Sequence, residues 1–157
     1  MIIVQGFISG LIATILFDLF NHSLNYAYNI DKPKWYLLGR YFIGYKQRRY
    51  FRGKLEEDGE EDNEIFWGYI IHYIIGIIYG LFYVCLNLFF FDYPSLLIAY
   101  LFGFITVLGA WCFLMPFAFN LGFFASKSDQ QFNILVQNLI GHFVFGTGLF
   151  IGYYISF

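Results

Sequence analysis

Residues 65–91 read IFWGYIIHYIIGIIYGLFYVCLNLFFF, an apolar run without Asp, Glu, Lys or Arg. A helix needs about 20 mainly apolar residues to cross the hydrocarbon core of a membrane, and this run is long enough. Strands of a membrane barrel alternate apolar and polar residues instead, and residues 70–78 do not. The run therefore predicts a membrane-spanning helix.

Three further stretches of the chain have the same character. Of the 157 residues, 59% are hydrophobic and only 13% are charged, whereas a soluble domain carries about 25% charged residues. We therefore expect an all-α membrane protein with one four-helix transmembrane domain over residues 1–157. The other predicted spans cover residues 2–20, 95–119 and 132–157, and an amphipathic cytoplasmic loop, residues 23–64, joins the first two helices.

The distribution of positive charge predicts how the chain crosses the membrane. Eight of the nine Lys and Arg residues lie between the first two spans, and the ninth, Lys127, lies between the last two. Loops rich in Lys and Arg stay in the cytoplasm. Both termini should then be periplasmic. No Lys or Arg precedes the first span and no cleavage site follows it, so we expect the mature protein to retain it.

The first loop begins with an aromatic and basic segment, residues 35–51. Amphipathic rings and cations both find partners at the headgroup level of a membrane. The same composition can bind single-stranded nucleic acid, but the acidic run at residues 56–64 disfavours that partner. We predict membrane lipids as the partner and no nucleic acid. The candidate headgroup contacts are Trp35, Arg40, Arg48, Arg49 and Arg52.

A few polar side chains interrupt the spans and converge in depth. Ionisable groups inside a membrane are costly and usually face the interior of the bundle. Counted from the cytoplasmic ends, Asp18 should lie about 6 Å inside, His72 about 10 Å and His142 about 15 Å. We predict one polar centre in the cytoplasmic half of the bundle. Its candidate members are Asp18, His72, His142, Asn138, Thr14 and His22.

Several uses of this centre are open. The residues could only hydrogen-bond between helices, or bind a small polar solute or relay protons. His72 and His142 could hold haem, and with Asp18 they could hold iron or zinc. Glycines beside both histidines are suited to close helix contacts, so we expect no haem, metal or other cofactor. No hydrolase or phosphate-binding motif occurs, and no catalytic residue is predicted.

The third span ends differently from the others, at Met115-Pro116. Proline lacks an amide proton and clashes with the preceding turn, so the helix should kink or stop there. The apolar residues 117–126 then form either an interfacial turn or a segment that re-enters the membrane.

Five short motifs spread along the chain resemble a known family. They are Gly10-x-x-Ala13-Thr14-x-x-x-Asp18, Trp35-x-x-Leu38-Gly39-Arg40, Glu64-x-x-x-Gly68-x-x-x-His72-Tyr73-x-x-Gly76, Pro116 with Gly122-x-x-Ala125-Ser126-Lys127, and His142-x-x-Phe145-Gly146-x-Gly148-Leu149. Together they resemble the bacterial four-span membrane proteins classed as domain of unknown function 2938. The resemblance implies a protein of the bacterial inner membrane and no particular chemistry.

Two classes of function follow from these patterns. One is a small carrier or channel-like protein that binds a small molecule or moves protons, and four spans would then need a homo-oligomer to enclose a path. The other is an accessory or scaffold protein that packs against lipids or a larger membrane complex. A wet cavity reaching Asp18 and His72 would favour the first class, and a dry bundle would favour the second.

Overall fold

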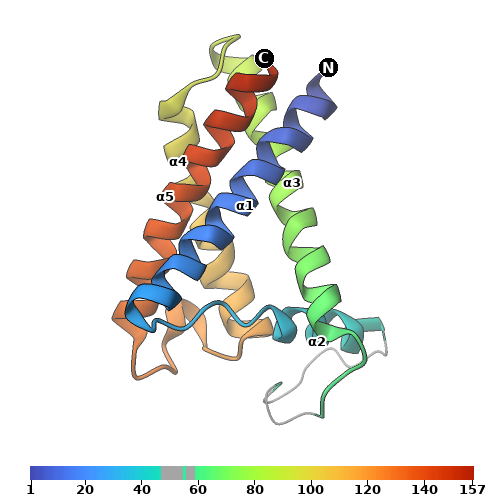
Figure 1. Cartoon of the computed structure of the whole chain (residues 1–157), viewed down its shortest axis with the longest axis vertical. Helices are drawn as coiled ribbons and strands as arrows, with labels where there is room; N and C mark the ends of the chain where they lie inside the picture. Colours follow the sequence, from blue (N-terminus) through green and yellow to red (C-terminus); the bar gives the residue numbers. More distant parts are fainter. Residues whose placement is uncertain (47–54, 56–58) are drawn as a thin grey trace. The chain divides into compact units, whose positions relative to one another are not determined.

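The structure is a computed structural model that describes residues 1–46, 55 and 59–157 (Figure 1). These residues form helices and connecting segments, and no strand occurs among them. The predicted all-α fold is confirmed. The helices are α1 (Ile2–Tyr28), α2 (Trp35–Lys46), α3 (Glu64–Phe90), α4 (Leu96–Gly109), the π-helix η1 (Ala110–Ala118), the 3₁₀-helix η2 (Phe123–Ala125) and α5 (Gln131–Ser156).

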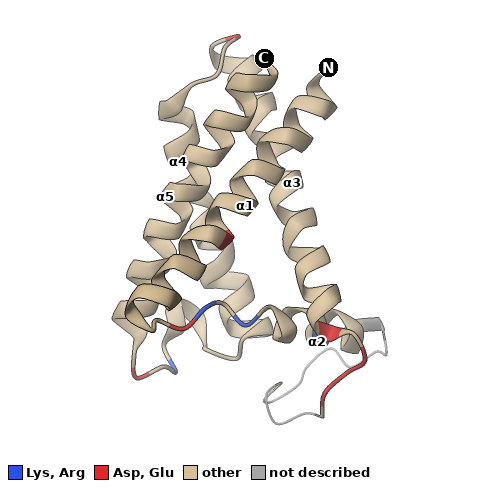
Figure 2. Ribbon diagram, viewed as in Figure 1, with Lys and Arg blue, Asp and Glu red and all other residues tan. Residues whose placement is uncertain are grey.

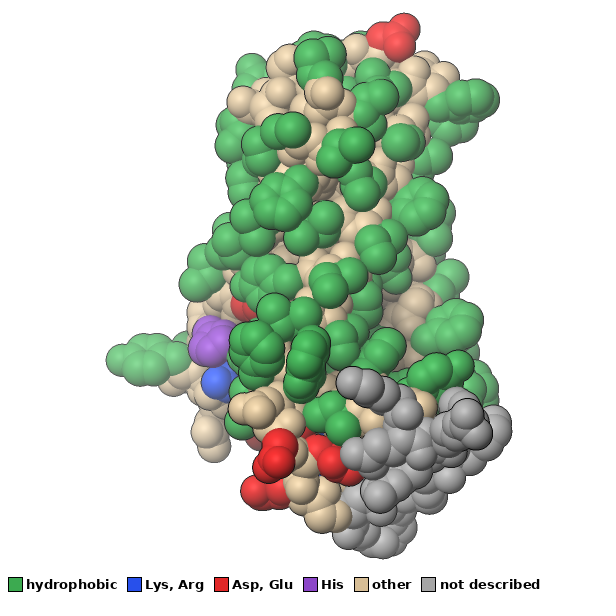
Figure 3. Space-filling view, turned by 90° about the vertical axis from the view of Figure 1, so that its right-hand side faces the viewer, with side chains coloured by type: hydrophobic (Ala, Val, Ile, Leu, Met, Phe, Trp, Pro, Cys, Tyr) green, Lys and Arg blue, Asp and Glu red, His purple; other side chains and the backbone are tan. Residues whose placement is uncertain are grey.

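Four helices are long and apolar enough to span a membrane: α1, α3, α4 continued by η1, and α5. Three agree with the predicted bounds to within one residue, but α1 ends at Tyr28 instead of residue 20. Figure 2 shows that acidic and basic residues lie mostly on connections and helix ends. Large apolar side chains such as Phe82, Phe89 and Phe113 are exposed, and hydrophobic atoms dominate the face in Figure 3. The chain is a multi-pass membrane protein.

The chain divides into two compact units. The first unit consists of Met1–Lys32, Tyr73–Val107 and Asn138–Phe157, and the second unit consists of Pro33–His72 and Leu108–Gln137. The first unit therefore holds most of the spanning helices, and the second holds α2, η1, η2 and the helix ends beside them.

Glycines bring the helices of the first unit into backbone contact. A Cβ built on Gly148 of α5 would lie 2.5 Å from the Cα of Ala13, and one on Gly10 would lie 2.6 Å from the Cα of Ile77. Such distances leave no room for a side chain. Helices in lipid associate through small residues because close backbones gain van der Waals contact, so α1 packs tightly against α3 and α5.

In the second unit, α2 packs on the first turns of α3 through two facing glycines. A Cβ on Gly39 would overlap the carbonyl oxygen of Glu64, and one on Gly68 would overlap that of Trp35. The sequence predicted this segment as part of an amphipathic loop, and the structure shows that it is a helix. The face of α2 that carries Gly39 packs on the spanning helix α3.

The end of the third span is a π-helix that contains Pro116. The helix runs two residues past the proline and ends at Ala118. The amide of Phe119 donates to the carbonyl of Leu114 at 2.9 Å, five residues back. Wider π-turns mark places where a helix accommodates a local irregularity. Left-handed backbone follows at Asn120, Phe124 and Ala125.

Candidate functional site

His142 is the spanning histidine whose surroundings in the first unit are best described. The Oγ1 of Thr106, on α4, lies 3.0 Å from its Nδ1, and the Thr106 hydroxyl also donates to the carbonyl of Gly103 at 2.8 Å. A hydroxyl has one proton to donate. With that proton on Gly103, the Nδ1–H of His142 is the donor to Thr106.

Aromatic rings and close backbone surround the same imidazole. The ring of Phe17, on α1, meets His142 edge-on with centroids 5.6 Å apart, and Phe145 lies 6.1 Å away. A Cβ on Gly103 would lie 2.6 Å from the carbonyl oxygen of His142. The imidazole is therefore held in a partly apolar site between α1, α4 and α5, with Thr106 as its polar neighbour.

The other residues predicted for the polar centre of the first unit take different environments. Thr14 is fully buried and donates to the carbonyl of Gly10 on its own helix at 2.7 Å. His22 is exposed, and its Nδ1 lies 2.9 Å from the backbone oxygen of Asp18. Asp18 itself is half-buried, next to Phe17, and Asn138 is half-buried one turn before His142. Of these residues, Asp18 directly follows Phe17, whose ring contacts His142.

His72 belongs to the second unit and stacks on Trp35 of α2. The two ring centroids are 3.8 Å apart and the planes differ by 19°. Trp35 also lies against Phe119, at 6.1 Å. The two units are described separately, so the idea that Asp18, His72 and His142 form one centre stays a prediction.

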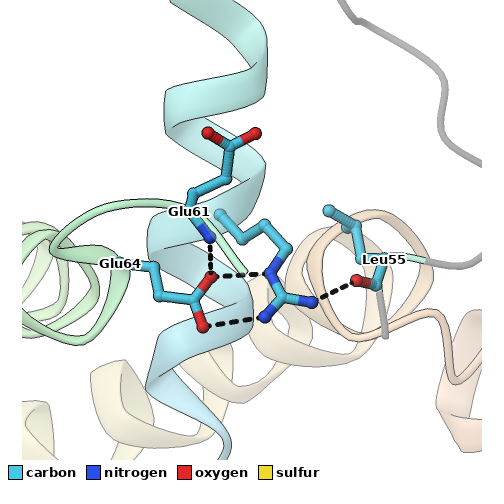
Figure 4. A network of polar contacts seen from close by, with 4 residues as sticks. Leu55, Glu61 and Glu64 are labelled. Carbon is cyan, nitrogen blue, oxygen red and sulfur yellow. Dashed lines mark hydrogen bonds and ion pairs between the residues drawn. The ribbon is translucent and has the colours of Figure 1, made fainter. Parts of the chain in front are cut away.

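Arg40 and Glu64 form a charged site in the second unit (Figure 4). The Nε of Arg40 donates to Oε2 of Glu64 at 2.7 Å and its Nη2 donates to Oε1 at 2.8 Å. Its Nη1 donates to the carbonyl of Leu55 at 2.7 Å, and the amide of Glu61 donates to Oε2 at 2.9 Å. The hydrogen bonds to Glu64 raise the pKa of Arg40 above its ordinary value. Each guanidinium nitrogen thus has a partner, so the pair is suited to holding α2 on α3.

Two of the candidates for lipid-headgroup contact are buried within the chain, and their contact with lipid stays a prediction. Trp35 is 8% exposed and Arg40 only 3%. Both are turned inward because α3 supplies their partners, a carboxylate from Glu64 and a ring from His72. Arg48, Arg49 and Arg52 lie outside the described residues.

Glu64 is the functional residue that the sequence reasoning missed, because it was counted with the solvated acidic run before it. Its position offered a signal. It directly precedes the apolar run of α3, where an unpaired carboxylate beside the membrane would be costly. That position calls for a cation from elsewhere in the chain.

The histidines and acidic residues of the spans are also the candidate ligands for a metal ion or haem. Within the part of the chain that the structure describes, no group of three or more His, Cys, Asp and Glu residues is placed to hold a metal ion. Haem held by His72 and His142 stays untested, and we expect purified protein to lack a Soret band. A stoichiometric band that disappears on replacing either histidine by Ala would contradict that expectation.

Comparison with known proteins gives one match. The family model described as Protein of unknown function (DUF2938) matches residues 7–156. No curated protein and no solved structure matches the chain. The resemblance inferred from the five motifs is therefore confirmed.

Proposed function

The chain belongs to the DUF2938 family, and we propose that it handles protons or a small polar solute through ionisable residues within its spanning helices. The observation that carries this proposal is the hydrogen bond of His142 with Thr106, between two spanning helices. An ionisable side chain kept inside a membrane span is costly and usually marks a route for ions, protons or substrate.

The chemistry of His142 suits proton transfer. Its Nδ1–H donates to Thr106 in the arrangement described above, so Nε2 is the atom that would take up a proton. Histidine changes charge near neutral pH, and a carboxylate nearby would favour the charged imidazole. In this proposal Asp18, which belongs to the same unit, is the candidate for that carboxylate.

Proton flux into reconstituted vesicles tests the proposal. Wild-type protein in phosphatidylcholine vesicles that contain a pH-sensitive dye should acidify the lumen when an inward proton gradient and a potassium–valinomycin potential are applied. His142→Gln, which keeps a hydrogen-bonding side chain without a titratable nitrogen, should lose that flux. Asp129→Asn removes an exposed titratable residue outside the proposed centre and is the control.

Two results would overturn the proposal. One is flux that His142→Gln leaves unchanged. The other is no flux, together with a His142 side chain whose nitrogen resonances do not titrate between about pH 5 and pH 8.

An accessory or scaffold role is the second candidate, and close packing favours it. Glycine contacts such as Gly148 on Ala13 bring helix backbones together within the first unit, and large hydrophobic side chains remain exposed for lipid or for other membrane proteins (Figure 3). In lipid nanodiscs made with excess lipid, a scaffold should be recovered with a constant partner protein, and the purified chain should show no proton flux. Proton flux by the purified chain would favour the first candidate.

We also propose that the protein lies in the bacterial inner membrane with both termini in the periplasm. The positively charged connections support this orientation. Green fluorescent protein fused after Phe157 should stay dark, because it does not mature in the periplasm, whereas a fusion ended after Lys127 should fluoresce. A bright fusion at Phe157 would reverse the orientation.

A further inference from the structure

A second polar cluster lies in the first unit, around the turn between α3 and α4. Tyr83 and Asn87 stand one turn apart on α3, Ser95 precedes α4, and Tyr153 comes from α5. Tyr83, Asn87 and Tyr153 are fully buried, and Ser95 is 9% exposed. Such a cluster is unusual inside an apolar bundle, and none of its members was singled out by the sequence patterns.

Three hydrogen bonds tie part of this cluster together. The Tyr83 hydroxyl donates to the carbonyl of Ser95 at 3.1 Å, the amide of Ser95 donates to Oδ1 of Asn87 at 2.7 Å, and Nδ2 of Asn87 donates to the carbonyl of Tyr83 at 2.8 Å. The Asn87 side chain also acts as a hydrogen-bond donor to the Tyr83 hydroxyl. A hydroxyl oxygen and an amide oxygen each have two lone pairs, so the Tyr83 hydroxyl and Oδ1 of Asn87 each keep one acceptor position.

Tyr153 completes the cluster with a hydroxyl that has no hydrogen-bond partner among the described residues, although its oxygen is buried. Its ring meets that of Tyr83 edge-on, with centroids 6.0 Å apart, and its hydroxyl interacts electrostatically with Asp92 in the exposed turn. Trp111 Nε1 is also buried without a partner, but its side chain is partly exposed and belongs to the second unit. A buried hydroxyl without a partner is costly, so the Tyr153 site points to a missing ligand.

We propose that the Tyr153 hydroxyl, with Tyr83 and Asn87, forms a binding site for one water molecule. The donors and acceptors of all three side chains are neutral, which suits a neutral ligand, since a buried charge needs a countercharge. A buried water typically makes about three hydrogen bonds to otherwise unsatisfied groups, and the hydroxyls and amide offer both donors and acceptors.

This site is separate from the proton chemistry proposed at His142. Eleven residues of α5 separate His142 from Tyr153, which corresponds to about 16 Å along a helix. Failure of either proposal therefore leaves the other standing.

Transfer of magnetisation from water tests the site directly. The full protein, labelled with ¹³C at the tyrosine ζ carbon and reconstituted in phosphatidylcholine vesicles, is measured by water-edited solid-state NMR. The Tyr153 signal is identified by its loss in Tyr153→Phe. We expect it to receive magnetisation from water within milliseconds, as an exposed tyrosine does, despite its burial.

The unfolding midpoint is a second test, because the direction of its change distinguishes a hydrated Tyr153 hydroxyl from a dry one. If the hydroxyl binds water, Tyr153→Phe should lower the unfolding midpoint by about 2–4 °C, the shift for loss of one hydrogen bond in a chain of this size. Tyr154→Phe, at an exposed neighbouring ring, should leave the midpoint unchanged. A Tyr153 signal that builds up as slowly as a dry aromatic carbon, or a midpoint that is unchanged or raised in Tyr153→Phe, would overturn the proposal.

Discussion

The Arg40–Glu64 site of the second unit and the His142–Thr106 site of the first unit both place polar side chains in or at the end of a spanning helix. They satisfy these side chains in different ways. Arg40 and Glu64 carry full charges, and their side chains are 4% and 11% exposed. Each oxygen and nitrogen of the pair is used in hydrogen bonds to the partner or to backbone. His142 and Thr106 share a single hydrogen bond between groups that can both be neutral. The charged pair thus lies at the first turn of a spanning helix, where loop backbone supplies further hydrogen bonds.

This difference separates a structural site from a candidate chemical one. All three guanidinium nitrogens and both carboxylate oxygens of the ion pair are engaged within the chain, so the pair is suited to fixing α2 on α3. A histidine side chain can change its charge near neutral pH, whereas the charged pair keeps its charges. Variants of the two sites should therefore differ in what they change: the charged site should affect stability, and the histidine site should affect activity.

The largest expected effect comes from breaking the charged pair. Glu64→Gln leaves the buried guanidinium of Arg40 without its carboxylate, and removing one partner of a buried ion pair costs about 3–5 kcal/mol. We expect the free energy of unfolding in mixed micelles of dodecylmaltoside and dodecyl sulfate to fall by that amount. Arg40→Gln combined with Glu64→Gln should recover part of the loss, because no unpaired charge then remains.

Glu60→Gln is the control for this prediction. Glu60 is an exposed member of the same acidic run, and its neutralisation should leave the unfolding free energy nearly unchanged. Equal losses from Glu60→Gln and Glu64→Gln would mean that the total charge of the run matters, and the contrast between the two units would fail.

The next largest effect concerns the glycine contact beside that pair. Gly39→Ala would place a Cβ on the carbonyl oxygen of Glu64 and 2.7 Å from the amide nitrogen of Gly68. Both are backbone atoms, so α2 must move, and overpacking of this kind costs about 1–3 kcal/mol. Unfolding in the same micelles measures the cost.

Two other glycines serve as matched variants, one in close backbone contact and one without neighbouring atoms. Gly148→Ala meets the Cα of Ala13 at 2.5 Å in the first unit and should cost a similar amount, because both units depend on backbone contact. A Cβ on Gly59 has no atom within 4 Å, so Gly59→Ala should change stability by less than about 0.5 kcal/mol. A large loss in Gly59→Ala would show that steric contact is not the cause.

The sequence predicted the spans well because hydropathy alone determines them. Three of the four agree with the structure to within one residue. The exception is α1, whose helical hydrogen bonding continues past the predicted end of the span to Tyr28 and stops at the left-handed Asn29. A hydropathy pattern reports where a chain is apolar, and a helix ends where its backbone bonding ends.

Side-chain partners were harder to predict because they depend on contacts between distant residues. His142 was recognised from its place in a span, but Thr106, 36 residues away, was not. Arg40 was assigned to lipid because its partner Glu64, 24 residues further on, looked like a solvated charge. Pairings of this kind follow from how helices pack, which the pattern of one segment does not contain.

The smallest effect is expected at the His142–Thr106 pair, and its size decides whether the two units really differ. Thr106→Val removes the hydroxyl while keeping the shape of the side chain, and one hydrogen bond between membrane helices contributes about 0.6 kcal/mol on average. Thr106→Ser keeps the hydroxyl, so its hydrogen bond with His142 should remain as in the wild-type protein. Unfolding in mixed micelles gives the stability change, and the nitrogen resonances of His142 show whether Nδ1 has lost its partner. Stability should fall several-fold less in Thr106→Val than in Glu64→Gln, while the His142 resonances shift in Thr106→Val alone. A loss as large as that of Glu64→Gln would make the histidine site a structural one, and the division between a stabilising second unit and a chemically active first unit would have to be given up.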